Sequence, residues 1–147
     1  MKQPIRQREQ YAFIFPIQTR WADNDLYGHV NNVSYYSYFD SAANALLIQH
    51  CQFDPQHATS IGLVVESMCQ FHQELSYPEI IEVGVAISKI GNSSVTYDLA
   101  IFKQQQADAA AQGHFVHVFV DRNTRQSTTL MQTTREALKP FLFKPLA

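Results

Sequence analysis

Two acidic residues and a histidine lie close together, directly before a predicted helix. Asp23, Asp25 and His29 belong to one polar loop that follows Thr19. Carboxylates and imidazoles are the side chains that most often transfer protons or attack electrophilic centres in enzymes. Acids in front of a helix also serve simply to cap it and to complement its dipole. The loop therefore admits a catalytic and a purely structural interpretation.

The element that must position this loop is a helix that begins near Asn32. Apolar and aromatic residues recur at helical spacing from Val33 to His50, which predicts a helix about 27 Å long at 1.5 Å per residue. Asn32 is a suitable N-cap, because its side-chain oxygen can accept a hydrogen bond from one of the first backbone N–H groups. These open N–H groups and the helix dipole favour negative charge just in front of Asn32.

The loop and the start of the helix carry a recognisable motif. The residues Asp23-x-Asp25-x-x-Gly28-His29-Val30-Asn31-Asn32-x-x-Tyr35 follow Arg20-Trp21. This pattern resembles the signature of the 4-hydroxybenzoyl-CoA thioesterase family, whose members are acyl-CoA thioesterases. The stretch Ala111 to Asp121, with Thr124 after it, resembles the last strand and following turn of that family.

The resemblance implies an α+β hotdog fold, in which an antiparallel five-stranded sheet wraps around one long helix. It also implies a homodimer or homotetramer with the active site at the subunit interface. Asp25 falls on the catalytic aspartate, as nucleophile or general base. Gly28 falls on the loop glycine, and Asn32 on the residue whose backbone N–H contacts the thioester carbonyl. Asp23 is interpreted as structural, and His29 either positions substrate or water or only braces the loop.

A further acid, Glu66, lies in the middle of an apolar strand. Such surroundings disfavour an unpaired carboxylate. We expect Glu66 to be either a second catalytic acid that reaches the site from the partner subunit or a salt-bridged structural residue, and we favour the first. Arg20 is a possible ionic partner for an acid of the site. His114 and His117 are three residues apart on a predicted strand, so they point to opposite faces and cannot share a metal ion. No metal and no cofactor are expected, since CoA is part of the substrate.

Length and composition bound the class of protein. The 147 residues suit a single domain, 1–147, with residues 1–10 expected to be loose and 132–147 expected to form a closing segment. A net charge of −2 argues against nucleic-acid binding. Two cysteines cannot build a disulfide framework. Residues 1–10 lack the apolar core expected of a signal peptide, and no run of about 18 apolar residues could span a membrane; we therefore expect a cytoplasmic protein.

The remaining elements are predicted mostly as strands. A first strand near Tyr11 to Ile17 contains Pro16, which predicts an edge position or a bulge. The tight turn Gly91-Asn92-Ser93 predicts a hairpin. The other predicted elements are strands Ile61–Leu75, Ile80–Ile90, Ser94–Gln104 and Ala110–Asp121, and a short helix Thr134–Leu138 stopped by Pro140.

These observations favour an acyl-CoA thioesterase. The alternatives are an acyl-carrier-protein thioesterase and a non-catalytic dimeric domain that binds acyl-CoA. Tyr27 argues against the carrier-protein alternative, because some of those enzymes have asparagine at that position. Candidates to contact the phosphates of CoA are Lys89, Lys103, Arg122 and Arg125.

Overall fold

The computed structural model describes residues 3–146, so the predictions for residues 1, 2 and 147 lie outside the described residues. The long helix and all five strands predicted from the sequence are present. Short 3-10 turns occur at Arg8–Gln10, Trp21–Asp23 and Lys139–Phe141. The other elements are β1 (Phe13–Gln18), α1 (Asn32–His50), β2 (Ser60–Phe71), β3 (Ile80–Ile90), β4 (Ser94–Lys103), β5 (Ala111–Asp121) and α2 (Gln132–Leu138).

The five strands form one antiparallel sheet in the order β1-β3-β4-β5-β2. Pro16 lies on the edge strand β1, where a missing N–H costs no ladder bond, as predicted. β2 ends at Phe71, four residues earlier than predicted. The strand ends because the N–H groups of His72 and Gln73 both donate to the Ala110 carbonyl, which closes the ladder with β5.

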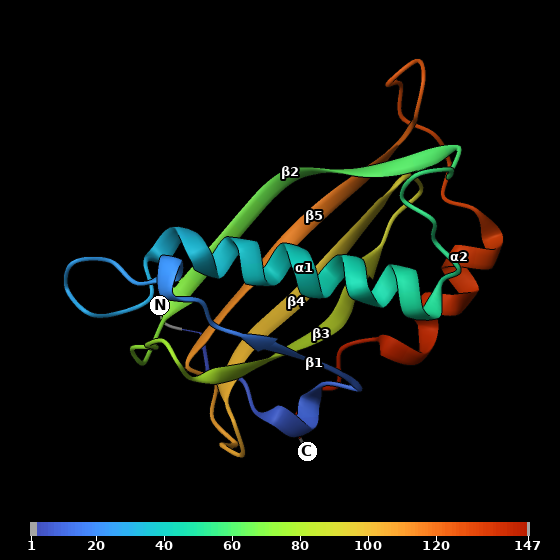
Figure 1. The fold of residues 1–147 in the computed structure, drawn as a ribbon. Coiled ribbons are helices and arrows are strands. Elements are labelled where there is room, and N and C mark those ends of the chain that lie inside the picture. The colour runs from blue at the N-terminus through green and yellow to red at the C-terminus, as the bar shows by residue number, and fades with distance from the viewer. Residues whose placement is uncertain (1–2, 147) are drawn as a thin grey trace.

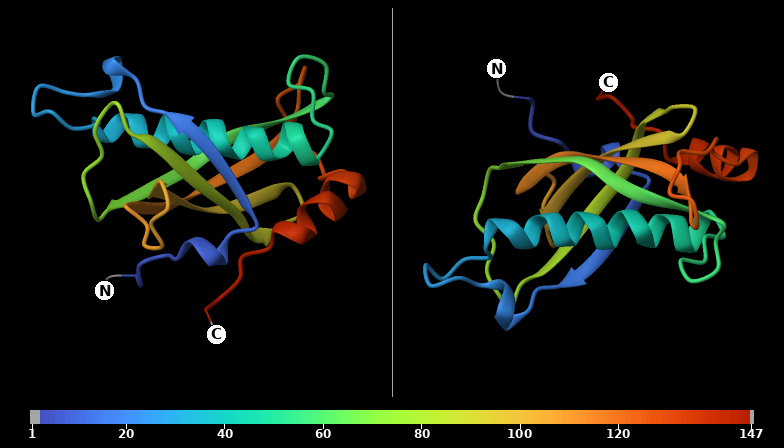
Figure 2. Two further views of the ribbon diagram at one scale, coloured as in Figure 1. Left: turned by 60° about the horizontal axis from the view of Figure 1, so that its bottom comes forward. Right: turned by 90° about the horizontal axis from the view of Figure 1, so that it is seen from above.

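α1 lies across one face of this sheet (Figure 1). Its fully buried Phe39 and Leu46 pack with Tyr97, Ile101 and Phe115 from the middle strands. The sheet curls around the helix (Figure 2), so the core is the layer between them. This is the predicted hotdog arrangement. Within residues 3–146, none of the helices combines the length and the apolar character needed to cross a membrane.

The opposite face of the sheet is partly covered by the two ends of the chain (Figure 2). The prediction that the first ten residues are loose is wrong for the described part, residues 3–10. The Arg6 guanidinium pairs with the buried Asp98 of β4 at 2.8 Å and lies 4.6 Å above the ring of Phe143. Tyr11 also donates to Asp98. An acid buried on this face needs these partners, and the N-terminal segment supplies them.

The C-terminal segment closes the far end of the molecule. α2 begins at Gln132, two residues before the predicted Thr134, and buries Leu138. Pro140 lies in the 3-10 turn that follows, so the α-helix ends before it, as predicted. α2 lies near the C-terminal end of α1 (Figure 2), which is the opposite end from the acid loop.

Candidate active site

The acid loop is held in place by the connection between β2 and β3. A bridge between Asn24 and Val30 closes the loop on itself. The Val30 N–H donates to the Leu75 carbonyl at 2.8 Å, and the Ser76 hydroxyl donates to the Gly28 carbonyl at 2.8 Å. Neither Leu75 nor Ser76 was predicted to support the site, since a lone serine or leucine in a distant loop carries no sequence signal.

Asp23 is buried beneath the loop and has no free oxygen. It accepts hydrogen bonds from the Arg20 backbone at 2.9 Å, the Arg20 guanidinium at 2.9 Å and the Tyr38 hydroxyl at 2.7 Å. Burial alone would raise the pKa of Asp23, but the bonds from Tyr38 and Arg20 outweigh it and hold the pKa below its usual value. Asp23 therefore joins the loop to α1, and Arg20 is its ionic partner.

Asp25 is half-buried and only partly engaged. One carboxylate oxygen accepts the Tyr27 N–H at 2.9 Å, and the Asp25 backbone N–H donates to the His29 carbonyl at 2.9 Å. Within residues 3–146 the other carboxylate oxygen has no protein hydrogen-bond partner. One oxygen thus shapes the turn, while the second is available for chemistry.

The start of α1 differs from the prediction by one residue. The N-cap is Asn31, whose side chain accepts the Val33 N–H at 3.0 Å, and Asn32 is the first helical residue. The two asparagines have equal capping chemistry. The Asn31 N–H donates to the Asp23 carbonyl at 2.8 Å, which places Asn31 at the end of the loop. The Asn32 N–H has no partner in the described chain, so it is the open donor at this end of the helix.

Gly28 and His29 complete the loop. Gly28 has a φ of +87°, a left-handed conformation that favours glycine. The His29 Nε2 lies 2.8 Å from a carboxylate oxygen of Glu74 in the β2–β3 connection. This contact fits the bracing role for His29. Glu74 was not predicted, because its partner is 45 positions away in the sequence.

Glu66 is not surrounded by apolar side chains as the sequence suggested. It lies on an edge strand, opposite Val116 of β5 and on the sheet face that points away from α1. Its side chain is 63% exposed and pairs with the His114 Nε2 at 2.8 Å. No hydrogen bond joins it to the acid loop of its own chain. Within one subunit, the contacts of Glu66 are those of a salt-bridged structural residue.

The two histidines of β5 face opposite sides of the sheet, as predicted. His117 points inward, where its Nδ1 lies 3.0 Å from the Tyr97 hydroxyl. Burial lowers the pKa of His117 to about 4, so the ring is neutral at physiological pH. Among residues 3–146, no cluster of three or more histidine, cysteine, aspartate or glutamate side chains is arranged to hold a metal ion.

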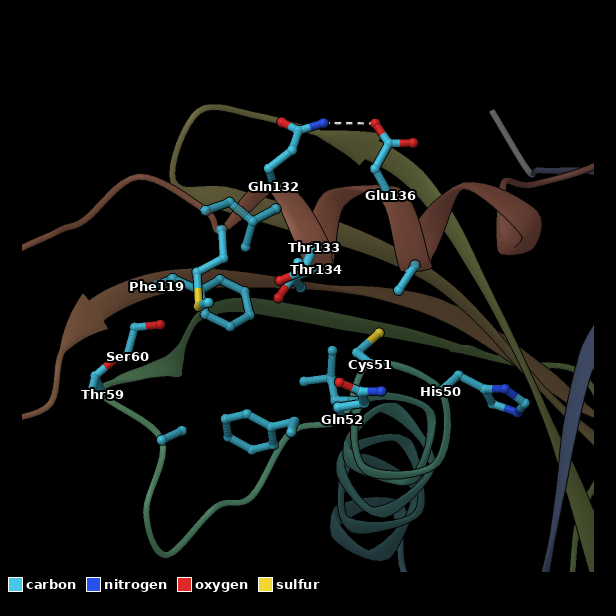
Figure 3. Close-up of a pocket in the computed structure, with 16 residues that line it drawn as sticks. His50, Cys51, Gln52, Thr59, Ser60, Phe119, Gln132, Thr133, Thr134 and Glu136 are labelled. Carbon is cyan, nitrogen blue, oxygen red and sulfur yellow. Dashed lines mark hydrogen bonds between the residues drawn. The ribbon is translucent and has the colours of Figure 1, made fainter.

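A cavity of about 670 Å³ lies at the C-terminal end of α1, lined by His50 and Cys51 among others (Figure 3). Asp25 precedes the other end of this helix. The walls of the cavity come from the last turn of α1 and the loop after it, the start of β2, Phe119 of β5, and α2 with the two residues before it. The 19 residues of α1 separate it from the acid loop by about 28 Å along the helix axis. None of the predicted site residues lines it. No pattern in the sequence indicates this cavity, because segments that are distant along the chain form it.

Of the cations proposed for CoA, two have partners within the chain. Arg122 donates to the carbonyls of Ala58 and Pro55 and thereby holds the loop before β2. Lys103 lies 4.0 Å from Glu79. Arg122 therefore has a structural role in this protein.

Comparison with known proteins supports the fold. The crystal structure of the PA5185 protein from Pseudomonas aeruginosa PAO1 has a TM-score of 0.94 and 45% identity, covering 97% of this chain and 100% of that one. Slr0204, a 1,4-dihydroxy-2-naphthoyl-CoA thioesterase from Synechocystis, has a TM-score of 0.77 at 18% identity, and the match covers 86% of this chain and 94% of Slr0204. The uncharacterized protein YsmA of Bacillus subtilis is 19% identical over 131 residues, 89% of this chain and 88% of YsmA.

The family comparison covers most of the chain. The profile of the thioesterase-like superfamily matches residues 19–138. This range contains the acid loop, α1, strands β2 to β5 and α2. The chain therefore belongs to the thioesterase-like superfamily, as a thioester hydrolase with the hotdog fold.

Proposed function

We propose that this protein hydrolyses an acyl-CoA thioester to the free acid and CoA at the junction of the acid loop and α1. The observation that carries the proposal is that two groups without protein hydrogen-bond partners lie at the same end of the molecule. Asp25 keeps one carboxylate oxygen without a protein partner, and Asn32 keeps an open N–H. The Asn24–Val30 bridge and the Asn31-to-Asp23 bond hold the two ends of the loop together.

Each of these groups has a task in thioester hydrolysis. The Asn32 N–H, with the helix dipole behind it, stabilises the negative charge that develops on the carbonyl oxygen. Asp25 either attacks the carbonyl carbon, expelling the CoA thiolate and leaving an anhydride that water cleaves, or removes a proton from the attacking water. Both routes give one carboxylic acid and one CoA per water consumed.

A homodimer through the edge strand β2 belongs to the same proposal. β2 is 12 residues long and contains no proline, lysine or arginine, and its edge is interrupted only by a bulge at Val65 and by Glu66. Leu63, Val64 and Val65 are 38%, 46% and 60% exposed. An exposed apolar edge of this length is a template for pairing, and a second copy of the same edge closes the pairing with two-fold symmetry.

The two alternatives have less support. Tyr27 and the net charge of −2 count against an acidic carrier protein as the substrate. In a non-catalytic binding domain, the Asp25 carboxylate oxygen that has no hydrogen-bond partner would have no chemical role. Both alternatives give distinct outcomes in the experiment below.

The test is thiol release from short, long and aromatic acyl-CoAs by the wild type and by Asp25→Asn. We expect turnover of at least part of the panel and a loss of about a hundredfold or more in the variant, the scale for removing a nucleophile or general base. Asp108→Asn, an exposed acid in the β4–β5 turn, is the matched control and should keep full activity.

Three other outcomes contradict the proposal in different ways. Activity on acyl-carrier-protein thioesters alone supports the carrier-protein alternative. Binding of acyl-CoA without any turnover supports the binding domain. Turnover that survives Asp25→Asn keeps the reaction and moves the chemistry to another residue, with His29 and Glu66 as the next to substitute.

A further inference from the structure

The cavity between α1 and α2 has a mixed lining, in which the apolar surface exceeds the polar surface although polar residues such as His50, Thr59 and Thr134 also line it. Most of its inner surface is apolar, and the thiol of Cys51 faces it (Figure 3). Burial raises the pKa of Cys51 to about 11, so the thiol is neutral at physiological pH. The apolar lining residues are Leu47, Phe53, Ala58, Phe119, Leu130, Met131 and Ala137.

The charges of the lining residues restrict the chemical class of ligand that the cavity can hold. Neither lysine nor arginine is among the lining residues, so His50 is the one lining side chain that can become cationic, and the one acid there, Glu136, is paired with Lys139 at 2.9 Å. The phosphates of CoA would have no lysine or arginine partner here. The volume of about 670 Å³ falls within the range of about 300–1,000 Å³ typical of small-molecule sites. The cavity therefore fits an uncharged, largely apolar group better than it fits the phosphates of CoA.

The edge strand β2 connects this cavity to the acid loop in space. Ser60, the first residue of β2, lines the cavity. Phe71, the last residue of β2, packs edge-on against Tyr35 in the first turn of α1, with ring centroids 4.9 Å apart. β2 and α1 thus run in opposite directions (Figure 1), and each end of β2 marks one of the two sites.

When β2 pairs with β2 of a second subunit about a two-fold axis, the two strands run in opposite directions. The Ser60 end of one β2 then lies beside the Phe71 end of the other. The cavity of one subunit comes to lie beside the acid loop of its partner, whereas the two sites of a single chain stay about 28 Å apart along α1. Only the arrangement between subunits brings the reacting carbonyl close to an apolar cavity.

We propose that the α1–α2 cavity of one subunit holds the acyl chain of the thioester that is cleaved at the acid loop of the other subunit. This inference rests on the proposed function and adds to it the substrate class, which is an aliphatic acyl group long enough to cross the interface. A short acyl group would be cleaved without entering the cavity. Selectivity for chain length is then a property of α2 and the start of β2.

The first test fills the cavity and measures chain-length selectivity. Ala137→Phe and Thr134→Phe place an aromatic ring in the cavity from α2. We expect kcat/KM for long-chain acyl-CoA to fall about tenfold or more, the scale for blocking an apolar pocket, while activity on short-chain acyl-CoA is unchanged. Ala107→Phe, in the exposed β4–β5 turn, is the matched control. Retained short-chain activity also shows that the variants fold.

The second test asks which subunit supplies the cavity. Mixed dimers are purified in which one subunit carries Ala137→Phe and the other carries Asp25→Asn. The intact Asp25 then lies opposite the open cavity of the partner, so long-chain activity should return to about half of the wild-type level, because one of two symmetric sites is complete. A cavity that served its own subunit would give no long-chain recovery.

The outcomes separate this inference from the proposed function. If the wild type cleaves no thioester, both the proposed function and the cavity assignment are wrong. A wild type that loses activity with Asp25→Asn, but keeps its chain-length profile with both cavity variants, retains the function and overturns the cavity assignment. Loss of long-chain activity in the filled homodimer without recovery in the mixed dimer overturns the assignment to the partner subunit.

Discussion

Asp23 and Asp25 are two residues apart on one loop, and their surroundings give them different roles. Asp23 is 2% exposed, and every hydrogen bond its carboxylate accepts comes from Arg20 or Tyr38. Asp25 is half-buried and keeps one oxygen unpartnered. The sequence favoured the second acid as the catalytic candidate only through the family motif. What the structure adds is the bond from Tyr38, which lies 15 positions from Asp23 on the buried side of α1 and occupies an oxygen of the first acid.

Replacing Asp23 by asparagine should destabilise the fold. The amide cannot accept all four bonds that the carboxylate accepts, because its NH₂ group would face Arg20 donors. We expect the free energy of unfolding at pH 7 to fall by about 2–4 kcal/mol, the range for breaking a buried charged hydrogen-bond network. Urea unfolding of the wild type and Asp23→Asn measures this difference.

The pH dependence identifies the ionised carboxylate as the cause. The pKa of Asp23 is below its ordinary value of 3.8 in the folded chain. Its contribution is therefore fully present above pH 3.8 and is lost as the pH falls through the folded pKa. The gap between wild type and variant should be constant near neutral pH and should narrow below about pH 4. A gap that stays constant down to pH 2 would assign the effect to shape and not to charge.

At the scale of elements, the acid loop depends on one backbone conformation. Gly28 has a φ of +87°, and a Cβ built there would meet no atom within 4 Å. Any cost of a side chain at this position is therefore conformational and not steric crowding. An alanine in the left-handed region costs roughly 1–2 kcal/mol, whereas asparagine visits this region more readily.

We expect Gly28→Ala to lower thioesterase turnover and stability more than Gly28→Asn does, although asparagine is the larger residue. The loop in the alanine variant must either bear the strain or shift Asp25, whose carbonyl accepts the Gly28 N–H at 3.2 Å. Chemical unfolding and thiol release on both variants provide the comparison. Equal effects of the two substitutions would show that volume, and not backbone conformation, limits this position.

The elements predicted well are those defined by local periodicity. α1, β3 and the hairpin turn after it follow from side-chain spacing alone, and their bounds agree with the structure within one or two residues. The N-cap was misplaced by one residue, because two neighbouring asparagines differ only in a bond from Asn31 to Asp23. The environment of Glu66 was wrong because the apolar residues beside it mark an exposed edge and not a core.

The contacts that the sequence did not reveal are all long-range. Arg6 binds Asp98 across 92 positions, and His29 meets Glu74 across 45. The α1–α2 cavity needs the end of α1, the start of β2, Phe119 of β5 and α2 to come together. Such pairings depend on the sheet order β1-β3-β4-β5-β2, which the order of strands along the chain does not determine.

At the scale of the whole molecule, the proposed site is complete only when two chains meet. The acid loop lies at one end of α1, the apolar cavity at the other, and the exposed edge of β2 runs between them. The fold therefore predicts that assembly and catalysis are lost together when this edge is blocked, even though Asp25 itself is untouched.

Val65→Lys is the variant that separates assembly from folding. Val65 is the extra residue of a β-bulge between Val64 and Glu66, so it has no partner on β5, and it is 60% exposed. A lysine there should change the stability of one chain by no more than about 0.5 kcal/mol, yet charge placed on an edge strand opposes pairing with a second copy. Sedimentation equilibrium should show a monomer.

The same variant should lose nearly all turnover of long-chain acyl-CoA, because the acid loop no longer meets a partner cavity. Ile5→Lys, which replaces a 44% exposed apolar side chain on the N-terminal segment, should remain dimeric and active. If Val65→Lys stays dimeric with normal turnover, β2 is not the interface, and the cavity cannot lie beside the acid loop of a partner. If it becomes monomeric and keeps long-chain activity, one chain is sufficient for catalysis.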